Sequence, residues 1–256
     1  MSSTEVDVDF FQENGYLLCR DVFDAGEVED MRGALERILE TVAGTKHDEN
    51  HAWSGVAQEA VLKGFHNVQY HDAAFTRAAA SPRLLEVLTR VIGPDVQLHH
   101  TKMLVKPPEQ GAPFPMHQDY PYFPHTRHSV VAASVHLDDT NEENGCLRVV
   151  AGSHKQGPLE AQGSSKTLDV PLEDGEPLPA RAGDVLLFSY LTIHGSGLNT
   201  SDAARRNVLF QYRDPADEPV LENGVEQHVN WGQGMMVAGR NPFYWQRHPR
   251  FEVKPA

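Results

Sequence analysis

The stretch Met116-His117-Gln118-Asp119 decides how the rest of this 256-residue chain is interpreted. Alternate side chains of a β-strand point to the same face, so His117 and Asp119 can reach one metal ion while Gln118 turns to the other side. Two imidazoles and one carboxylate on one face of an octahedron are the ligand set of Fe(II) oxygenases, and they leave positions open for a chelating co-substrate and O2. A third ligand must come from elsewhere in the chain, and His194 is predicted to supply it.

Spacing alone does not identify this site, because the chain has 14 histidines and a second triplet of the same form, His136-Leu137-Asp138. A motif this short is expected by chance about once in a chain of this composition. The second triplet ends an apolar run that begins at Val130, so His136 is interpreted as a buried, structural histidine. The competing interpretation is that His136 faces the pocket and touches substrate.

Further segments surround the first triplet in a fixed order. They are MHQDYPYFP at 116–124, ENGCL at 143–147, GSHK at 152–155, IHGSG at 193–197, and Arg205. In content and order they resemble the phytanoyl-CoA dioxygenase family from about residue 102 to about residue 212, and NGYL at 14–17 is similar to the start of that family. The resemblance implies a mainly β fold, a double-stranded β-helix (jelly-roll, cupin-like) core with flanking amino-terminal α-helices. It also implies Fe(II), with 2-oxoglutarate and O2 as co-substrates, and release of succinate and CO2 as the substrate is hydroxylated.

Carried over residue by residue, the resemblance makes His117, Asp119 and His194 the metal ligands and the catalytic centre. Arg205, eleven residues after His194, matches the arginine that binds the distal carboxylate of 2-oxoglutarate. A planar guanidinium suits that role because it pairs with a carboxylate through two hydrogen bonds. Arg206 would point to the opposite face of the same strand, so only one of the two arginines can enter the barrel, and the family spacing selects Arg205.

Three further residues complete the predicted co-substrate site. Ser196 lies two residues beyond His194 and can donate its hydroxyl to the same carboxylate. Lys102 matches a family position near the co-substrate, and Gln118 lies between two of the ligands. Each also has an ordinary structural interpretation: Ser196 and Gln118 as polar residues of a turn or strand, and Lys102 as a solvated lysine on a strand.

Composition limits the partners of the protein. A formal net charge of −14 argues against a nucleic-acid or anionic-membrane partner, since both carry negative charge, and a small-molecule substrate is expected instead. Two cysteines are too few for a disulfide scaffold and suit a reducing compartment. No apolar run long enough for a membrane span, no signal peptide and no peroxisomal carboxyl-terminal address is found, so a cytoplasmic location is expected.

The chain is interpreted as one domain, 1–256, with a helical part at about 1–95, a barrel at about 96–215 and a carboxyl-terminal segment at 216–256. Asp24 is predicted to cap one helix, and Ser81 with Pro82 to begin another that stops at Gly93. The runs 184–190 and 207–212 are predicted to be strands joined by a long turn, with His194 at the end of the first. Residues 111–115 and 160–179 are predicted to be loops, the latter long enough to act as a lid.

The identity of the substrate is not determined by the sequence, nor is the oligomeric state. An aromatic lining is expected from Tyr120, Tyr122, Phe123 and Tyr190, with Trp231, Phe243 and Trp245 closing over it. An acyl-CoA thioester, as in a phytanoyl-CoA-like hydroxylase, would need basic residues at the mouth, for which Arg127, Arg148 and Lys155 are candidates.

Two hypotheses from different functional classes compete with the oxygenase: an inactive cupin-like binding protein, and a barrel enzyme that uses no keto acid. The intact set of His117, Asp119, His194 and Arg205 argues against both. Asp119 also argues against halogen transfer, which requires its loss, whereas desaturation, epoxidation and ring closure stay open.

Overall fold

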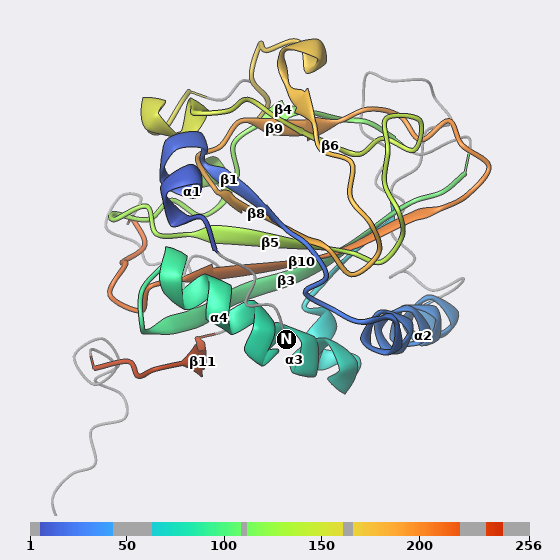
Figure 1. Ribbon diagram of the computed structural model, residues 1–256, viewed down its shortest axis with the longest axis horizontal. Coiled ribbons are helices and arrows are strands. Elements are labelled where there is room, and N and C mark those ends of the chain that lie inside the picture. The colour runs from blue at the N-terminus through green and yellow to red at the C-terminus, as the bar shows by residue number, and fades with distance from the viewer. Residues whose placement is uncertain (1–5, 43–62, 109–111, 161–165, 221–233, 243–256) are drawn as a thin grey trace, which may run out of the picture.

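Two antiparallel sheets form the body of the molecule, seen in a computed structural model that describes residues 6–42, 63–108, 112–160, 166–220 and 234–242 (Figure 1). The major sheet contains β1 (Tyr16–Cys19), β2 (Lys63–His66), β3 (Val96–Lys106), β5 (Val131–His136), β8 (Val185–Ser189), β10 (Arg205–Arg213) and β11 (Met235–Ala238). Its order is β1-β8-β5-β10-β3-β11, and β2 also pairs with β3. The minor sheet contains β4 (Phe114–His117), β6 (Leu147–Val149), β7 (Glu176–Pro177) and β9 (His194–Ser196), in the order β4-β9-β6-β7.

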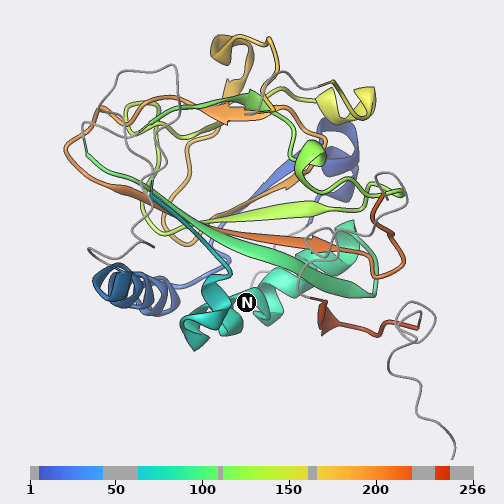
Figure 2. The same cartoon turned by 180° about the vertical axis from the view of Figure 1, so that it is seen from behind.

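The helices at 25–42, 73–79 and 82–91 cover one face of the major sheet, the helix at 8–14 lies at its β1 edge, and the minor sheet lies over the other face (Figures 1 and 2). The α-helices are α1 (Val8–Asn14), α2 (Ala25–Val42), α3 (Ala73–Ala79) and α4 (Pro82–Val91), and the 3-10 turns are η1 (Val68–Tyr70), η2 (Tyr120–Tyr122), η3 (Ser153–Gln156) and η4 (Leu172–Asp174). This is the predicted mainly β jelly-roll with flanking helices. Within the described residues, no helix is long and apolar enough to cross a lipid bilayer.

Both predicted helices are present, although the Ser81 side chain makes no capping hydrogen bond and α4 ends at Val91, two residues before Gly93. Before α2, Glu27 N–H donates to Asp24 Oδ1 (3.0 Å) while Asp24 N–H donates to Glu27 Oε2 (2.9 Å), which is a capping box. Pro82 occupies the first turn of α4, where no intrahelical donor is needed. Apolar residues of α2, α3 and α4 join one buried cluster with inward residues of β3, β5, β8 and β10. The apolar stripes of the helices therefore belong to the core.

Three parts of the chain differ from the expectation. The amino-terminal part is not only helical, because β1 pairs with β8 and β2 pairs with β3. Phe114 and Pro115, expected in a loop, belong to β4, and the expected loop at 160–179 contains η4 and β7. These strands have two to four residues, too few to show an alternating pattern of their own, and they form because a neighbouring strand completes their hydrogen bonds.

The largest difference concerns His194. It does not end the strand that begins near residue 184; β8 stops at Ser189, the chain crosses to the other layer, and His194 begins β9. In the minor sheet it lies directly opposite His117 of β4. The change of sheet brings the two histidines together. Nothing in the sequence of residues 190–193 predicts that the chain changes sheets there.

Inward positions of two central strands supply one wall of the interior. Lys106, Leu104, Lys102 and His100 alternate along β3, and they pair in order with Arg205, Asn207, Leu209 and Gln211 of β10. Because successive side chains of a strand point to opposite faces, these eight residues share the face toward the minor sheet. The register therefore places two cations, Lys106 and Arg205, at one end of this wall and two neutral polar residues, His100 and Gln211, at the other.

Candidate metal centre and cavity

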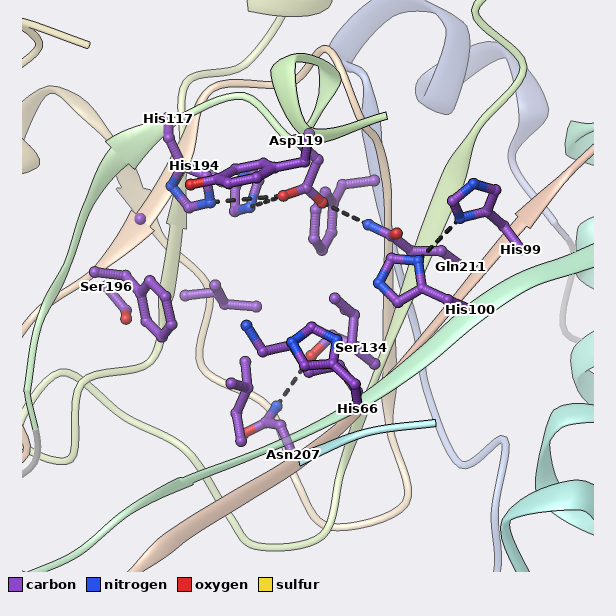
Figure 3. Close-up of a pocket in the computed structure, with 18 of the residues that line it drawn as sticks. His66, His99, His100, His117, Asp119, Ser134, His194, Ser196, Asn207 and Gln211 are labelled. Carbon is purple, nitrogen blue, oxygen red and sulfur yellow. Dashed lines mark hydrogen bonds and ion pairs between the residues drawn. The ribbon is translucent and has the colours of Figure 1, made fainter. Parts of the chain in front are cut away.

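Three side chains converge between the two sheets. His117 Nε2 lies 3.6 Å and His194 Nε2 3.8 Å from Asp119 Oδ1, and potential ligand atoms of the three residues all lie within 4.8 Å of one another. All three side chains are buried. Figure 3 shows them pointing toward one another at one side of the cavity.

Backbone carbonyls orient both imidazoles. His117 Nδ1 lies 2.8 Å from the carbonyl of Pro115, and His194 Nδ1 lies 2.9 Å from the carbonyl of Thr192. A carbonyl oxygen only accepts, so each Nδ1 carries the hydrogen and each Nε2 presents its lone pair to the shared point. Metal-binding histidines are oriented by this kind of contact. The donors therefore fit a divalent ion bound by two histidines and one carboxylate.

Asp119 reaches the same point by a turn, which corrects the expectation that it lies on a strand with His117. β4 ends at His117, and Asp119 has helical backbone angles (φ −76°, ψ −21°) at the start of η2. Its N–H donates to the carbonyl of Tyr190 (2.9 Å), which anchors the turn to the chain just before β9. Its second oxygen, Oδ2, accepts from Gln211 Nε2 (2.7 Å). Gln211 thus leaves Oδ1 as the oxygen available to a metal.

The protonation states suit a metal site. Burial and the neighbouring His117 lower the pKa of His194 to about 4. Burial alone would raise the pKa of Asp119, but hydrogen bonding with His117 and the positive charge that His194 carries at low pH, where Asp119 titrates, outweigh burial, and the pKa falls to about 2. His194 is therefore neutral and Asp119 ionised at neutral pH, which are the forms that bind a metal.

A cavity of about 530 Å³ opens beside these ligands. Its other walls come from residues of β3, β5, β8 and β10 in the major sheet, from β4, β6 and β9 in the minor sheet, and from residues 66–67 and 122–123. Tyr122 and Phe123 line it, as expected, but Tyr190 does not; its hydroxyl contacts His125 and His128 instead. Tyr120 is also outside the lining, and Trp231, Phe243 and Trp245 lie outside the described residues.

Two buried cations lie side by side where β3 pairs with β10: Arg205 lines the cavity, and Lys106 lies behind Ser196, outside the lining. Arg205 is 3% exposed and donates to Asn207 Oδ1 (3.0 Å) and to the carbonyl of Gly145; Lys106 is fully buried and donates to Ser196 Oγ (2.7 Å) and to the carbonyl of Gly197. Among the described residues, no carboxylate forms an ion pair with either cation. Burial lowers the pKa of Arg205 to about 10, and burial together with the charge of Arg205 lowers the pKa of Lys106 well below its usual value. An anion placed here would relieve both effects.

Arg206, the neighbour of Arg205, turns away from the cavity as predicted from strand alternation. Its guanidinium donates to both carboxylate oxygens of Asp138, at 2.9 Å and 2.7 Å. Asp138 belongs to the second His-x-Asp triplet, so that carboxylate is already paired. His136 does not line the cavity; its Nδ1 faces the carbonyl of Asp184 (3.3 Å), and its Nε2 has no hydrogen-bond partner among the described residues. The structural interpretation of His136 is the one that fits.

Gln118 requires a correction, because it faces away from the cavity. Its side-chain nitrogen donates to the carbonyls of Gly157 (3.0 Å) and Leu191 (2.7 Å), and its oxygen accepts from Leu159 N–H (2.9 Å). Every polar group of this amide is occupied by backbone. Gln118 therefore holds the metal-binding turn against two neighbouring loops and does not belong to the co-substrate site.

Two residues of the site were missed from the sequence: Lys106, which donates to Ser196, and Gln211, which donates to Asp119. Both lie at inward positions of β3 and β10 in the same alternation as Lys102 and Arg205. That alternation was visible in the sequence and could have indicated them. Lys102 itself lines the cavity, with Nζ 6.0 Å from the centre of the Phe114 ring.

Comparisons with known proteins identify dioxygenases as relatives of this chain. The family model described as Phytanoyl-CoA dioxygenase (PhyH) matches residues 11–207. A protein of Stutzerimonas stutzeri named probable alpha-ketoglutarate-dependent hypophosphite dioxygenase is 28% identical, over 91% of this chain and 86% of its own. The peroxisomal phytanoyl-CoA dioxygenase of Bos taurus is also 28% identical, over 85% of this chain and 71% of its own.

A solved structure of similar fold is that of SnoK, described as a non-heme alpha ketoglutarate dependent carbocyclase from nogalamycin biosynthesis. It superposes with a TM-score of 0.71 at 23% identity, covering 88% of this chain and 94% of its own. At this identity the likeness concerns the fold.

Proposed function

The chain belongs to the phytanoyl-CoA dioxygenase family, and from that membership we propose that it oxidises an unactivated C–H bond of a small-molecule substrate. It is an Fe(II)- and 2-oxoglutarate-dependent dioxygenase, in keeping with the names of its relatives. Hydroxylation is the expected outcome, with succinate and CO2 released. The observation that carries the proposal is the pairing of a His-Asp-His centre with two buried cations that have no carboxylate partner among the described residues.

His117, Asp119 and His194 would hold the ion, with Gln211 and two backbone carbonyls fixing their orientation. When bound, Fe(II) supplies the activation of O2 that amino-acid side chains cannot provide. The chain itself contributes ligand orientation, an ionised Asp119 and a cavity whose lining is mostly apolar. Because Asp119 would itself be a metal ligand, it leaves no place for a halide ion, which argues against halogen transfer.

The distal carboxylate of 2-oxoglutarate would be held by Arg205, Lys106 and Ser196. Buried cations without anionic partners are costly, and a carboxylate that accepts their hydrogen bonds offsets that cost. Lys106 donates to Ser196 Oγ, so the serine hydroxyl hydrogen is free to reach a ligand. Lys102, the remaining candidate in this set, faces the same cavity from a position nearer the metal ligands.

An acyl-CoA substrate finds less support. Each of the three basic residues considered for a CoA pocket interacts with an acidic residue: Arg127 with Asp214 (3.9 Å), Arg148 with Glu142, and Lys155 with Glu13 (2.6 Å). Arg127, Arg148 and Lys155 are also absent from the cavity lining. A cavity of about 530 Å³, which also receives 2-oxoglutarate, favours a compact substrate.

The test is an anaerobic titration with Fe(II) and then 2-oxoglutarate, followed by visible absorption of the metal-to-ligand charge-transfer band. We expect the band in the wild-type protein and its loss in Arg205→Ala with iron still bound. Metal binding without a band in the wild type would contradict the proposal and favour a binding protein. Succinate release on admission of O2 then provides the screen for substrates.

A further inference from the structure

The cavity wall formed by β3 contains a cation that the proposed chemistry leaves without a partner. Lys102 is mostly buried, lines the cavity, and makes no hydrogen bond or ion pair with another described residue. Its neighbours are the face of Phe114 and, at longer range, Asp119. A lysine on a cavity wall that forms no ion pair with protein is a candidate to bind a ligand.

Lys102 is separate from the cations assigned to 2-oxoglutarate. On β3 it pairs with Leu209, whereas Lys106 pairs with Arg205 four residues further along. Four residues of a strand span about 13 Å. Burial lowers the pKa of Lys102 while Asp119 opposes that shift, whereas the pKa of Lys106 is influenced by Arg205. The Nζ atoms of both lysines lie 6.0 Å from the centre of the Phe114 ring, so the lysines differ in their charged neighbours, which are Asp119 for Lys102 and Arg205 for Lys106.

Formal charges lead to the same conclusion. Asp119 is the single carboxylate among the described residues that line the cavity, whose lining cations are Lys102 and Arg205. A divalent ion is neutralised by Asp119 and the chelating carboxylate of 2-oxoglutarate, and the one negative charge of the distal carboxylate is shared by Arg205 and Lys106, so no carboxylate remains for Lys102. Lys102 is left with an uncompensated positive charge inside the protein, where a charge is costly unless it is paired.

The wall beside Lys102 can assist an anion without adding charge. His66 pairs with Lys102 across β2 and β3, and His100 is the next inward residue of β3. Burial, and next the neighbouring His66, lower the pKa of His100 to about 4, so it is neutral at physiological pH. A neutral imidazole still offers an N–H donor. Figure 3 shows His66 and His100 on the side of the cavity across from the metal ligands.

We propose that the primary substrate is a small anion, a carboxylate or a phosphorus oxyanion, whose charged group is bound by Lys102 on the β3 wall of the cavity, across from the metal ligands. This inference rests on the proposed function, because it assigns Asp119 and Arg205 to the metal and to 2-oxoglutarate. Binding the charge at Lys102 would hold the rest of a compact molecule between Phe123 and the metal ligands. The same arrangement would exclude cationic analogues of equal size.

The experiment uses protein loaded anaerobically with Fe(II) and 2-oxoglutarate. Propanoate and phosphite serve as anionic probes, and propanamide is the neutral isostere of propanoate. Calorimetry gives the Kd of each probe, and the charge-transfer band reports whether 2-oxoglutarate stays bound. We expect at least one anion to bind about tenfold or more tightly than propanamide, and the preferred probe distinguishes a carboxylate from a phosphorus oxyanion.

Variants separate the possible roles of Lys102. Lys102→Met should weaken binding of the preferred anion by about 10- to 100-fold and change the Kd of 2-oxoglutarate by less than about threefold. Lys102→Arg should retain most of the anion affinity. The matched control is Lys166→Met, which removes a positive charge beside Tyr122, outside the cavity lining, and should leave both affinities unchanged.

Three results would overturn the inference: propanamide binding as tightly as the anions, Lys102→Met binding the anions as well as the wild type, or Lys102→Met losing 2-oxoglutarate instead. The last would return Lys102 to the co-substrate site. The titrations are also made without 2-oxoglutarate. Failure of the wild-type band therefore removes the proposed function, whereas failure of the Lys102-dependent difference between propanoate and propanamide removes this inference alone.

Discussion

The two His-x-Asp triplets have the same spacing and opposite fates. His117 ends a short strand of the minor sheet, and the chain then turns so that Asp119 faces back toward it. His136 ends a strand in the middle of the major sheet, and Asp138 is bound by Arg206 through two hydrogen bonds. The spacing of a His-x-Asp triplet identifies two candidate ligands. Whether they can bind one metal ion depends on the backbone conformation between them and on whether the carboxylate is already paired with another residue.

The strongest test of the comparison removes the carboxylate of each triplet in turn. Asp119→Ala should lower Fe(II) affinity by at least about 100-fold and abolish succinate release, because the site keeps two imidazoles and no anion. Asp138→Ala should retain full iron stoichiometry, since its partner is Arg206. Equilibrium dialysis with Fe(II) measures both. Loss of iron in Asp138→Ala would show that the wrong triplet was chosen.

The adjacent arginines extend the comparison to the co-substrate. Arg205→Ala should raise the Kd of 2-oxoglutarate by about 10- to 100-fold with iron retained, because a buried charge-assisted hydrogen-bond donor is lost. Arg206→Ala removes the partner of Asp138 and should lower stability without changing that Kd. Calorimetry with 2-oxoglutarate and urea unfolding distinguish the two variants. Equal loss of 2-oxoglutarate binding in both would contradict the assignment of Arg205.

Gln211 tests whether the first triplet depends on support from the major sheet. Gln211→Leu removes the hydrogen bond to Asp119 Oδ2 and should weaken Fe(II) binding by about tenfold, the scale found when a partner of a metal ligand is lost. Because the carboxylate would be free to rotate, the charge-transfer band should also shift or broaden. An unchanged band together with unchanged iron affinity would show that Gln211 does not position Asp119.

The smallest expected effect concerns His136, whose pKa burial lowers to about 4, with Arg205 contributing next. As pH falls below the ordinary value of 6.5, the unfolded chain binds this proton before the folded protein does. Stability is therefore fully present above about pH 6.5 and declines as pH falls toward 4, by about 1–3 kcal/mol for this residue. In His136→Gln the decline, measured by urea unfolding at several pH values, should be shallower and iron binding should be intact. A slope equal to that of the wild type would contradict this account.

Much of the fold could be predicted from short patterns in the sequence. The capping residues of α2, the proline that begins α4 and the alternation along β3 and β10 are read within a few residues, because they depend on backbone hydrogen bonds and the period of the structure. They indicated the helices, the jelly-roll strands and the opposite directions of Arg205 and Arg206. Strands of two to four residues, such as β1, β2 and β7, were not indicated, since they exist only through pairing with distant strands.

The sequence by itself determined which chemistry is available: two histidines, one aspartate and one arginine in a recognisable order, within a chain of strongly negative net charge. Only the tertiary structure decided how those groups are used. The crossing from β8 to β9 placed His194 opposite His117, and the turn at Asp119 replaced the expected strand. The pairing of β3 with β10 brought Lys106 beside Arg205 and left Lys102 on the cavity wall beside Leu209. The physical reason is that burial and partner choice depend on contacts between residues far apart in the chain, and those contacts set which charges are neutralised and which stay free for a ligand.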